Sequence, residues 1–130
     1  MKYLLTVIAV SISLLSEQSI AAPQIAQTIN CAKATTTVEI NECTGREAKA
    51  ADRLLNQSYQ KLRPKLSTKQ RQRLTQAQLE WIKFRDRTCA YEAGELGGGT
   101  ASTAAYSSCI TRVTKQRNAD LQRYLEFYLL

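Results

Sequence analysis

Four cysteines in a short chain constrain this fold more than any other feature. They stand at positions 31, 43, 89 and 109 of 130 residues, and the sequence contains no histidine. No two of them form the Cys-x-x-Cys pair common in zinc sites, so we expect neither a bound metal nor any other cofactor. Two disulfides are expected instead, because cross-links compensate for the small core of an exported chain.

The first residues predict export. Lys2 precedes an apolar run from Tyr3 to Leu15, and Ser19-Ile20-Ala21 has the small residues that signal peptidase prefers. We expect a signal peptide over residues 1–21 and a single domain over residues 22–130, periplasmic or secreted. The run is short for a bilayer and no cysteine stands at the cleavage point, so we expect no transmembrane segment in the mature form and no lipid anchor.

The cysteine spacing favours one disulfide pairing. Of the three possible pairings, Cys31 with Cys43 and Cys89 with Cys109 closes two short loops, although the sequence leaves the other two open. Each bridge would contribute about 2 to 4 kcal/mol, against a typical total stability of about 5 to 15 kcal/mol.

Helical periodicity runs through the rest of the chain, with no competing strand pattern. A capping box beginning at Thr36 and a break at Pro64 predict a first helix over about 37–63. A second box beginning at Ser67 predicts a helix that extends to about residue 93.

Glycines at 94, 97, 98 and 99 interrupt the chain before a third helix, expected over about 103–127. The short turn at Pro64 and the glycine loop predict an all-α fold: a small three-helix antiparallel bundle stapled by two disulfides. All four cysteines would then lie at one end of the bundle.

Apolar residues at helical spacing define the expected core. Trp81 is interpreted as a core anchor rather than as a platform for a ligand. The stripe of the second helix comprises Leu74, Ala77, Trp81, Phe84 and Thr88. The third helix is expected to bury Ile110, Val113, Leu121, Tyr124 and Tyr128.

Polar residues near these stripes require partners, because an unpaired polar group close to a core is costly. We expect a structural polar network, with a recognition site as the alternative interpretation. Its members are Asp52, Asn56, Arg85, Asp86 and Arg117, of which Asp86 is expected to be the more exposed.

The charge of the chain is strongly uneven. The net charge is +7, and expected cleavage would remove one residue of each sign, Lys2 and Glu17. No acidic residue occurs between Asp52 and Glu80, so a basic cluster forms around the first turn. The cluster is either a solvated face or an anion-binding patch. We name as candidate partner-binding residues Lys61, Arg63, Lys65, Lys69, Arg71 and Arg73 and, in the loop, Gly97, Gly98 and Gly99.

Three sequence pieces together carry a family resemblance. They are Ala51-Asp52-x-x-Leu55-Asn56-x-x-Tyr59-x-x-Leu62, Ala77-Gln78-x-x-Trp81-x-x-Phe84-Arg85-Asp86-x-x-Cys89, and Cys109 followed by Thr114-x-x-Arg117-x-x-x-Leu121. The chain resembles the LprI-like lysozyme inhibitor domain family, formerly a domain of unknown function. The resemblance implies a small, exported, disulfide-bonded helical domain, and some members of the family inhibit lysozyme.

Catalysis is not expected. Without histidine, the hydrolase sites that need an imidazole are absent, although carboxylate or lysine chemistry stays open. The motif Gly94-x-x-x-x-Gly99-Thr100 lacks the lysine of a phosphate loop, so we interpret it as a connector.

Two binding functions follow. The first is inhibition of a peptidoglycan-cleaving lysozyme through the loop 94–102 or the basic cluster, although many lysozymes are basic and a +7 partner would be repelled at long range. The alternative is a periplasmic envelope protein that binds an anionic polymer, lipid headgroups or an acidic partner. Nucleic acid is not expected, because the aromatic residues fall in the apolar stripes instead of among the basic residues.

Overall fold

The computed structural model describes residues 29–128, and the predicted signal peptide lies outside them. Three long helices make up the fold: α1 (Thr37–Leu62), α2 (Thr68–Gly94) and α3 (Thr100–Glu126). Two short 3-10 turns accompany them, η2 (Cys31–Lys33) before α1 and η3 (Arg63–Lys65) between α1 and α2. The described part of the chain has no strand, as predicted, and α3 begins slightly earlier than expected.

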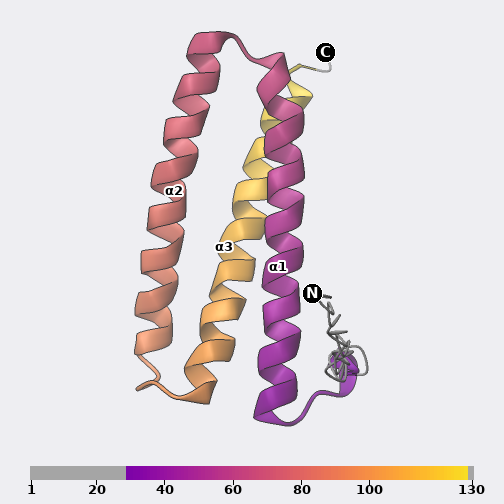
Figure 1. The fold of residues 1–130 in the computed structure, drawn as a ribbon, viewed down its shortest axis with the longest axis vertical. Coiled ribbons are helices and arrows are strands. Elements are labelled where there is room, and N and C mark those ends of the chain that lie inside the picture. Colours follow the sequence, from indigo (N-terminus) through magenta and orange to yellow (C-terminus); the bar gives the residue numbers. More distant parts are fainter. Residues whose placement is uncertain (1–28, 129–130) are drawn as a thin grey trace, which may run out of the picture.

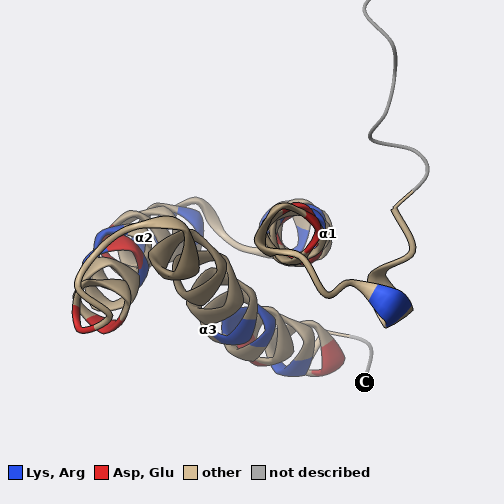
Figure 2. Ribbon diagram, turned by 90° about the horizontal axis from the view of Figure 1, so that it is seen from below, with Lys and Arg blue, Asp and Glu red and all other residues tan. Residues whose placement is uncertain are grey.

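The helices are arranged around α3. Both α1 and α2 pack along α3, whereas α1 and α2 approach each other far less closely. Figure 1 shows α3 between the other two, and Figure 2, along the helices, shows α1 and α2 on different sides of it. Helix α2 runs opposite to α1 and α3, because each connection reverses the chain.

Local sequence sets the ends of these helices. The Thr36 hydroxyl accepts from the backbone N–H of Glu39, and the Glu39 carboxylate accepts from the N–H of Thr36. Ser67 and Gln70 form the same reciprocal pair at the start of α2. Pro64 has no N–H to continue α1, so the chain turns through η3.

The apolar core lies in the half of the bundle nearest η3. Leu55, Leu62 and Leu121 are almost fully buried, and Trp81 packs against them while staying partly accessible. The opposite half buries mainly small side chains, including Ala93, Cys43, Cys89 and Cys109. Apolar burial is therefore concentrated toward one end of the molecule.

Some residues of the predicted stripes are exposed. Phe84 is 60% accessible and Ala77 is also exposed, so those two assignments to the core were wrong. The inward face of α2 instead includes Gln78, Trp81 and Cys89. Because α2 packs chiefly against α3 alone, only a narrow face is covered, and positions rotated by about 100° from it reach solvent.

Tyr124 and Tyr128 were likewise predicted to be buried and are exposed. Tyr124 lies in the last turn of α3 and Tyr128 just beyond it, where the bundle ends and fewer neighbouring side chains cover the chain. Ile110 and Val113 are partly covered, and Leu121 is fully buried, as expected.

Candidate functional site

The two disulfides gather at the end of the bundle opposite η3. Cys31 bonds Cys43, and Cys89 bonds Cys109, which is the pairing favoured from loop length. The first bond fastens η2 to α1, and the second joins α2 to α3 on either side of the glycine loop. We call this the loop end, comprising residues 31–46 and 88–112.

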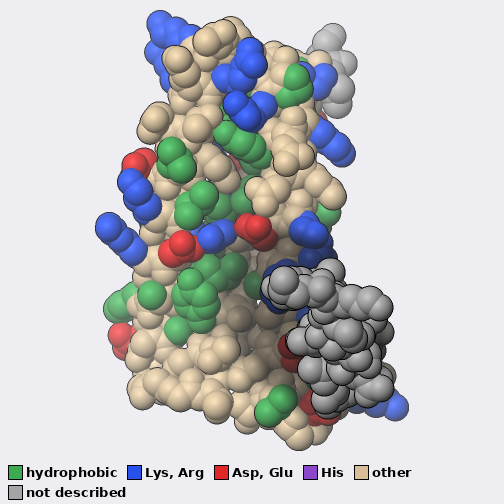
Figure 3. Space-filling view, in the orientation of Figure 1, with side chains coloured by type: hydrophobic (Ala, Val, Ile, Leu, Met, Phe, Trp, Pro, Cys, Tyr) green, Lys and Arg blue, Asp and Glu red, His purple; other side chains and the backbone are tan. Residues whose placement is uncertain are grey.

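A polar cluster crosses from α2 to α1 in the middle of the bundle. Arg85 contacts Asp86 at 2.8 Å and Asp52 at 3.4 Å, and its guanidinium lies 5.1 Å from the Trp81 ring centroid. The Asn56 amide donates to the second Asp52 oxygen at 3.0 Å. Figure 3 shows acidic and basic side chains side by side across this face, between hydrophobic groups. Arg85 thus joins the two helices that pack least closely.

Arg117 lies apart from that cluster. Its Nε donates to Gln78 at 3.1 Å, and none of the ion pairs between described residues joins it to Asp52. The prediction of one network containing Arg117 was therefore wrong in this detail. Arg117 projects from α3 to a buried amide of α2, whereas Asp52 is already occupied by Arg85.

Gln78 is the residue that the sequence interpretation missed. It precedes Trp81 by three positions and Arg85 by seven, so all three share one face of α2. This spacing was a usable signal. The face borders a hollow of about 340 Å³ between α1 and α2, whose wall also includes Leu55 and Tyr59. Among the described residues, the one carboxylate that lines this hollow belongs to Asp52, and it is paired with Arg85. This pairing favours a structural role for Asp52 over a catalytic one.

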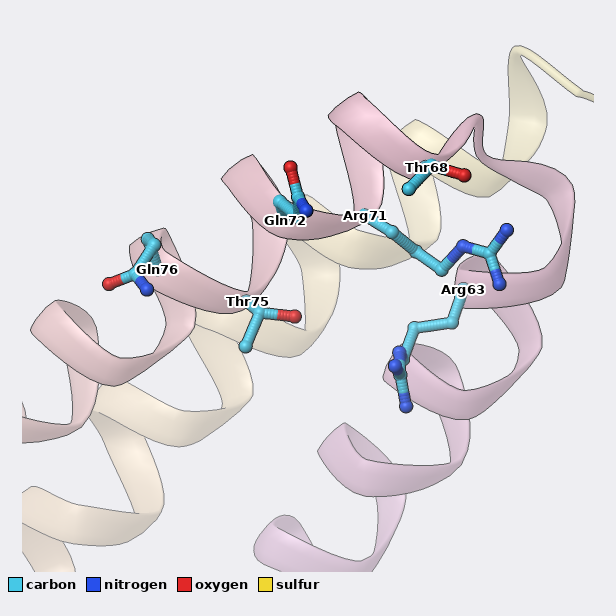
Figure 4. A pocket seen from close by; sticks show the side chains of 6 residues that line it. All are labelled: Arg63, Thr68, Arg71, Gln72, Thr75 and Gln76. Atoms are coloured by element: carbon cyan, nitrogen blue, oxygen red, sulfur yellow. The ribbon is translucent and has the colours of Figure 1, made fainter.

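The basic tip surrounds η3 at the other end of the molecule. We use this name for Lys61, Arg63, Lys65, Lys69, Arg71 and Arg73. Basic side chains gather at this upper end in Figure 3. Arg63 lies against the Tyr59 ring, 5.8 Å from its centroid. Within the tip, Arg63 and Arg71 line one polar hollow of about 370 Å³ between α1 and α2 (Figure 4).

The glycine loop projects from the loop end. Gly97, Gly98 and Gly99 have φ values of 72°, 85° and 84°, a backbone region that other residues rarely adopt. Side-chain space beside each of them is open, and residues 94–101 are all exposed. The loop is thus a shaped, accessible ridge anchored by the Cys89–Cys109 bond.

Charge at the loop end is close to balance. Its acidic side chains outnumber its basic ones by one, and ion pairs link Glu42 to Arg46 and Glu92 to Arg112. Exposed apolar side chains occur on every helix that meets there, at Val38, Tyr91 and Tyr106, and in the loop at Leu96. The loop end is therefore nearly neutral and partly apolar, unlike the basic tip.

Glu39 has the one perturbed ionisation resolved among the described residues. Backbone N–H groups of Thr36 and Thr35, together with the Thr36 hydroxyl, hold the pKa of the Glu39 carboxyl below its ordinary value. The cause is hydrogen bonding to the charged form at a helix start.

Within the described residues, no group of acidic and cysteine side chains is arranged to hold a metal, and no helix has the length and apolar character needed to span a bilayer.

Comparison with known proteins places the chain in a family. The family model described as lysozyme inhibitor LprI matches residues 30–121. An uncharacterised protein of Rhizobium meliloti (strain 1021) is 26% identical over 110 residues, covering 75% of this chain and 79% of its own. No solved structure matches. Since the family model spans most of the chain and all four cysteines, this protein belongs to the lysozyme inhibitor LprI family.

Proposed function

We propose that this protein binds a peptidoglycan-cleaving lysozyme and blocks its active-site cleft. Membership of the lysozyme inhibitor LprI family over residues 30–121 is the observation that carries the proposal. The protein acts by occupying the enzyme, without catalysis of its own. Action in the periplasm or outside the cell is supported by the two disulfides, which persist in oxidising compartments.

The contact we propose is the loop end. A cleft is blocked by a narrow element that enters it, and the ridge at Gly97–Gly99 is exposed and free of bulky side chains. Tyr91, 69% accessible, and Leu96, 54% accessible, flank the ridge. Aromatic and aliphatic groups of this kind are typical of the central part of protein interfaces.

The distance between the loop end and the basic tip also favours the loop end as the contact. Helix α2 has 27 residues, so about 40 Å of helix separates the glycine loop from the basic tip. That length exceeds the Debye length of about 8 Å at physiological salt several times. A basic lysozyme approaching the loop end is therefore screened from the charge of the tip, which reduces the repulsion expected from a net charge of +7.

An inhibition assay with a panel of lysozymes tests the proposal. We expect inhibition of at least one enzyme at micromolar concentration or below. Tyr91→Ala with Leu96→Ala should raise the inhibition constant at least tenfold, because it removes apolar contact beside the ridge. Absence of inhibition across a broad panel would refute a lysozyme-blocking function for this chain.

A charge reversal at the other end is the matched control. Lys65→Glu with Lys69→Glu changes two exposed residues of the basic tip and should alter the inhibition constant less than threefold. Loss of inhibition in this variant, with the loop variant unaffected, would move the contact to the tip. Inhibition through a packed apolar interface should also persist between 50 and 300 mM salt, conditions in which exposed charge contacts weaken.

A further inference from the structure

We propose that Arg63 and Arg71 form a binding site for a phosphate group in the hollow between the end of α1 and the first turns of α2. Six residues line this hollow, and every one carries a hydrogen-bonding side chain: Arg63, Thr68, Arg71, Gln72, Thr75 and Gln76. Figure 4 shows Arg63, from η3, and Arg71, from α2, side by side, with their guanidinium groups directed to different parts of the hollow. The proposal does not rest on lysozyme inhibition.

The two guanidinium groups lack acidic partners. Within the part of the chain that the structure describes, no ion pair includes Arg63 or Arg71. None of the six lining residues is acidic, and none of residues 53–79 is either. Two cations therefore share one hollow without a neutralising carboxylate, which is the electrostatic condition for binding an anion.

One donor in the hollow is enclosed and unused. The Arg71 Nε atom is buried and has no hydrogen-bond partner among the described residues. Buried donors in folded proteins almost always have an acceptor, because an unpaired one loses its water without compensation. Rotation of the Arg71 side chain toward an oxyanion in the hollow would supply that acceptor. Arg85, by contrast, satisfies its Nε with Asp86 at 2.8 Å.

The donor set suits phosphate. Guanidinium groups bind phosphate through paired N–H donors, and Thr68 and Thr75 add hydroxyl groups that can donate as well. Thr75 already shares a hydrogen bond of 2.9 Å with the Tyr59 hydroxyl, which fixes its side chain at the wall of the hollow. Thr68 is the first residue of α2, where the positive end of the helix dipole adds to the field. The volume of about 370 Å³ admits a phosphate together with the group that it esterifies.

Two sources of this chemistry are a soluble phosphate compound and the phosphodiester of a lipid headgroup. Inorganic pyrophosphate and vesicles of phosphatidylglycerol are the corresponding probes. The proposal predicts saturable calorimetric binding of pyrophosphate to the full protein at low salt. Sulfate at equal ionic strength should bind more weakly, since each ion has fewer negative charges to bridge the two guanidinium groups.

Matched charge variants distinguish a site from a diffuse basic surface. Arg63→Gln with Arg71→Gln should weaken pyrophosphate binding at least tenfold. Lys61→Gln with Arg73→Gln removes the same charge from the same tip but outside the hollow, and should weaken it less than threefold. Equal losses in both variants, or no binding by the unmodified protein at millimolar pyrophosphate, would overturn the proposal. Arg71→Lys keeps the charge but loses the paired donors, so its affinity for pyrophosphate should lie between those of the unmodified protein and the Arg63→Gln, Arg71→Gln variant. Thermal unfolding checks that each variant is folded.

Competition identifies the source. If pyrophosphate displaces the protein from phosphatidylglycerol vesicles, the site takes a lipid headgroup, whereas binding of pyrophosphate without vesicle attachment assigns it to a soluble phosphate compound. Vesicle attachment that survives Arg63→Gln with Arg71→Gln excludes the headgroup as the ligand of this site. Lysozyme inhibition should be unchanged in these variants, so failure here and failure of the proposed function are separate results.

Discussion

The two ends of this molecule are held together by different means. The end with the basic tip has the large apolar side chains, with Leu62 and Leu121 almost fully buried, and has no covalent cross-link among the described residues. The loop end buries chiefly cysteine, alanine and threonine and contains both disulfides. Where a small chain has little apolar volume to bury, a covalent bond substitutes for it.

The largest effect should come from removing the bond that joins α2 to α3. Cys89→Ser with Cys109→Ser opens a link with a sequence separation of 20 residues, and we expect a loss of roughly 3 kcal/mol in the free energy of unfolding. For a domain of this size the midpoint should fall by roughly 12 to 24 °C. Thermal melts followed by circular dichroism measure it.

The second disulfide provides the contrast. Cys31 ties down η2, which buries no residue, so Cys31→Ser with Cys43→Ser should cost at most about 1 kcal/mol, less than the roughly 2 to 4 kcal/mol expected from loop closure alone. Equal losses from the two pairs would show that the terminal segment contributes to the bundle as much as the link between helices does.

Removing Arg85 should have the next largest effect. The Arg85 side chain is 15% accessible, whereas Asp52 and Asp86 are about half accessible. Because water can solvate both carboxylates left behind, Arg85→Ala should lower the free energy of unfolding by about 1 to 2 kcal/mol. Urea denaturation is the measurement. Lys83→Ala, in the exposed pair with Glu80, is the control and should cost less than about 0.5 kcal/mol.

The glycine loop should respond to substitution according to backbone geometry. Gly98→Ala places a side chain at a φ of 85° and should destabilise by about 1 kcal/mol, although the space there is open. Gly94→Ala, within α2, should leave stability unchanged or raise it by about 0.5 kcal/mol. If the two substitutions had the same effect in chemical denaturation, the left-handed geometry would not be contributing.

The smallest expected effect concerns pH. The pKa of Glu39 is lowered in the folded protein by hydrogen bonds from Thr36 and Thr35, relative to its ordinary value of 4.5. The stabilisation of the folded state by these hydrogen bonds is therefore complete above the unfolded pKa of Glu39, and it is lost as pH falls from about 4.5 through the folded pKa. Protection factors of the amides at the start of α1, which correct for the intrinsic pH dependence of exchange, should fall over that range, and Glu39→Gln should remove this pH dependence.

The sequence predicted the elements of this fold far better than it predicted which face points inward. Capping boxes, Pro64 and the glycines are local signals, and each delimits a helix where it was expected. The orientation of α2 is a tertiary property: stripes through Phe84 and through Arg85 both fit helical spacing. Cys89 could have decided between them, since a side chain bonded to α3 must face α3 and Arg85 lies one turn before it.

The candidate sites show the same division. The basic tip is visible as a run without acidic residues, but the selection of Arg63 and Arg71 from it depends on which side chains enter the hollow between α1 and α2. Arg117 binds Gln78 and not Asp52, which is paired with Arg85. Charge and spacing along one chain do not determine which of these side chains on different helices meet.

The Cys89–Cys109 bond has a consequence for survival among proteases. An exposed, glycine-rich ridge is the type of segment at which proteases cut a folded chain. Any cut between residues 90 and 108 lies inside the ring closed by this bond, so the two fragments stay covalently attached. A nicked molecule would therefore keep α2 fastened to α3 and retain the flanks of the ridge.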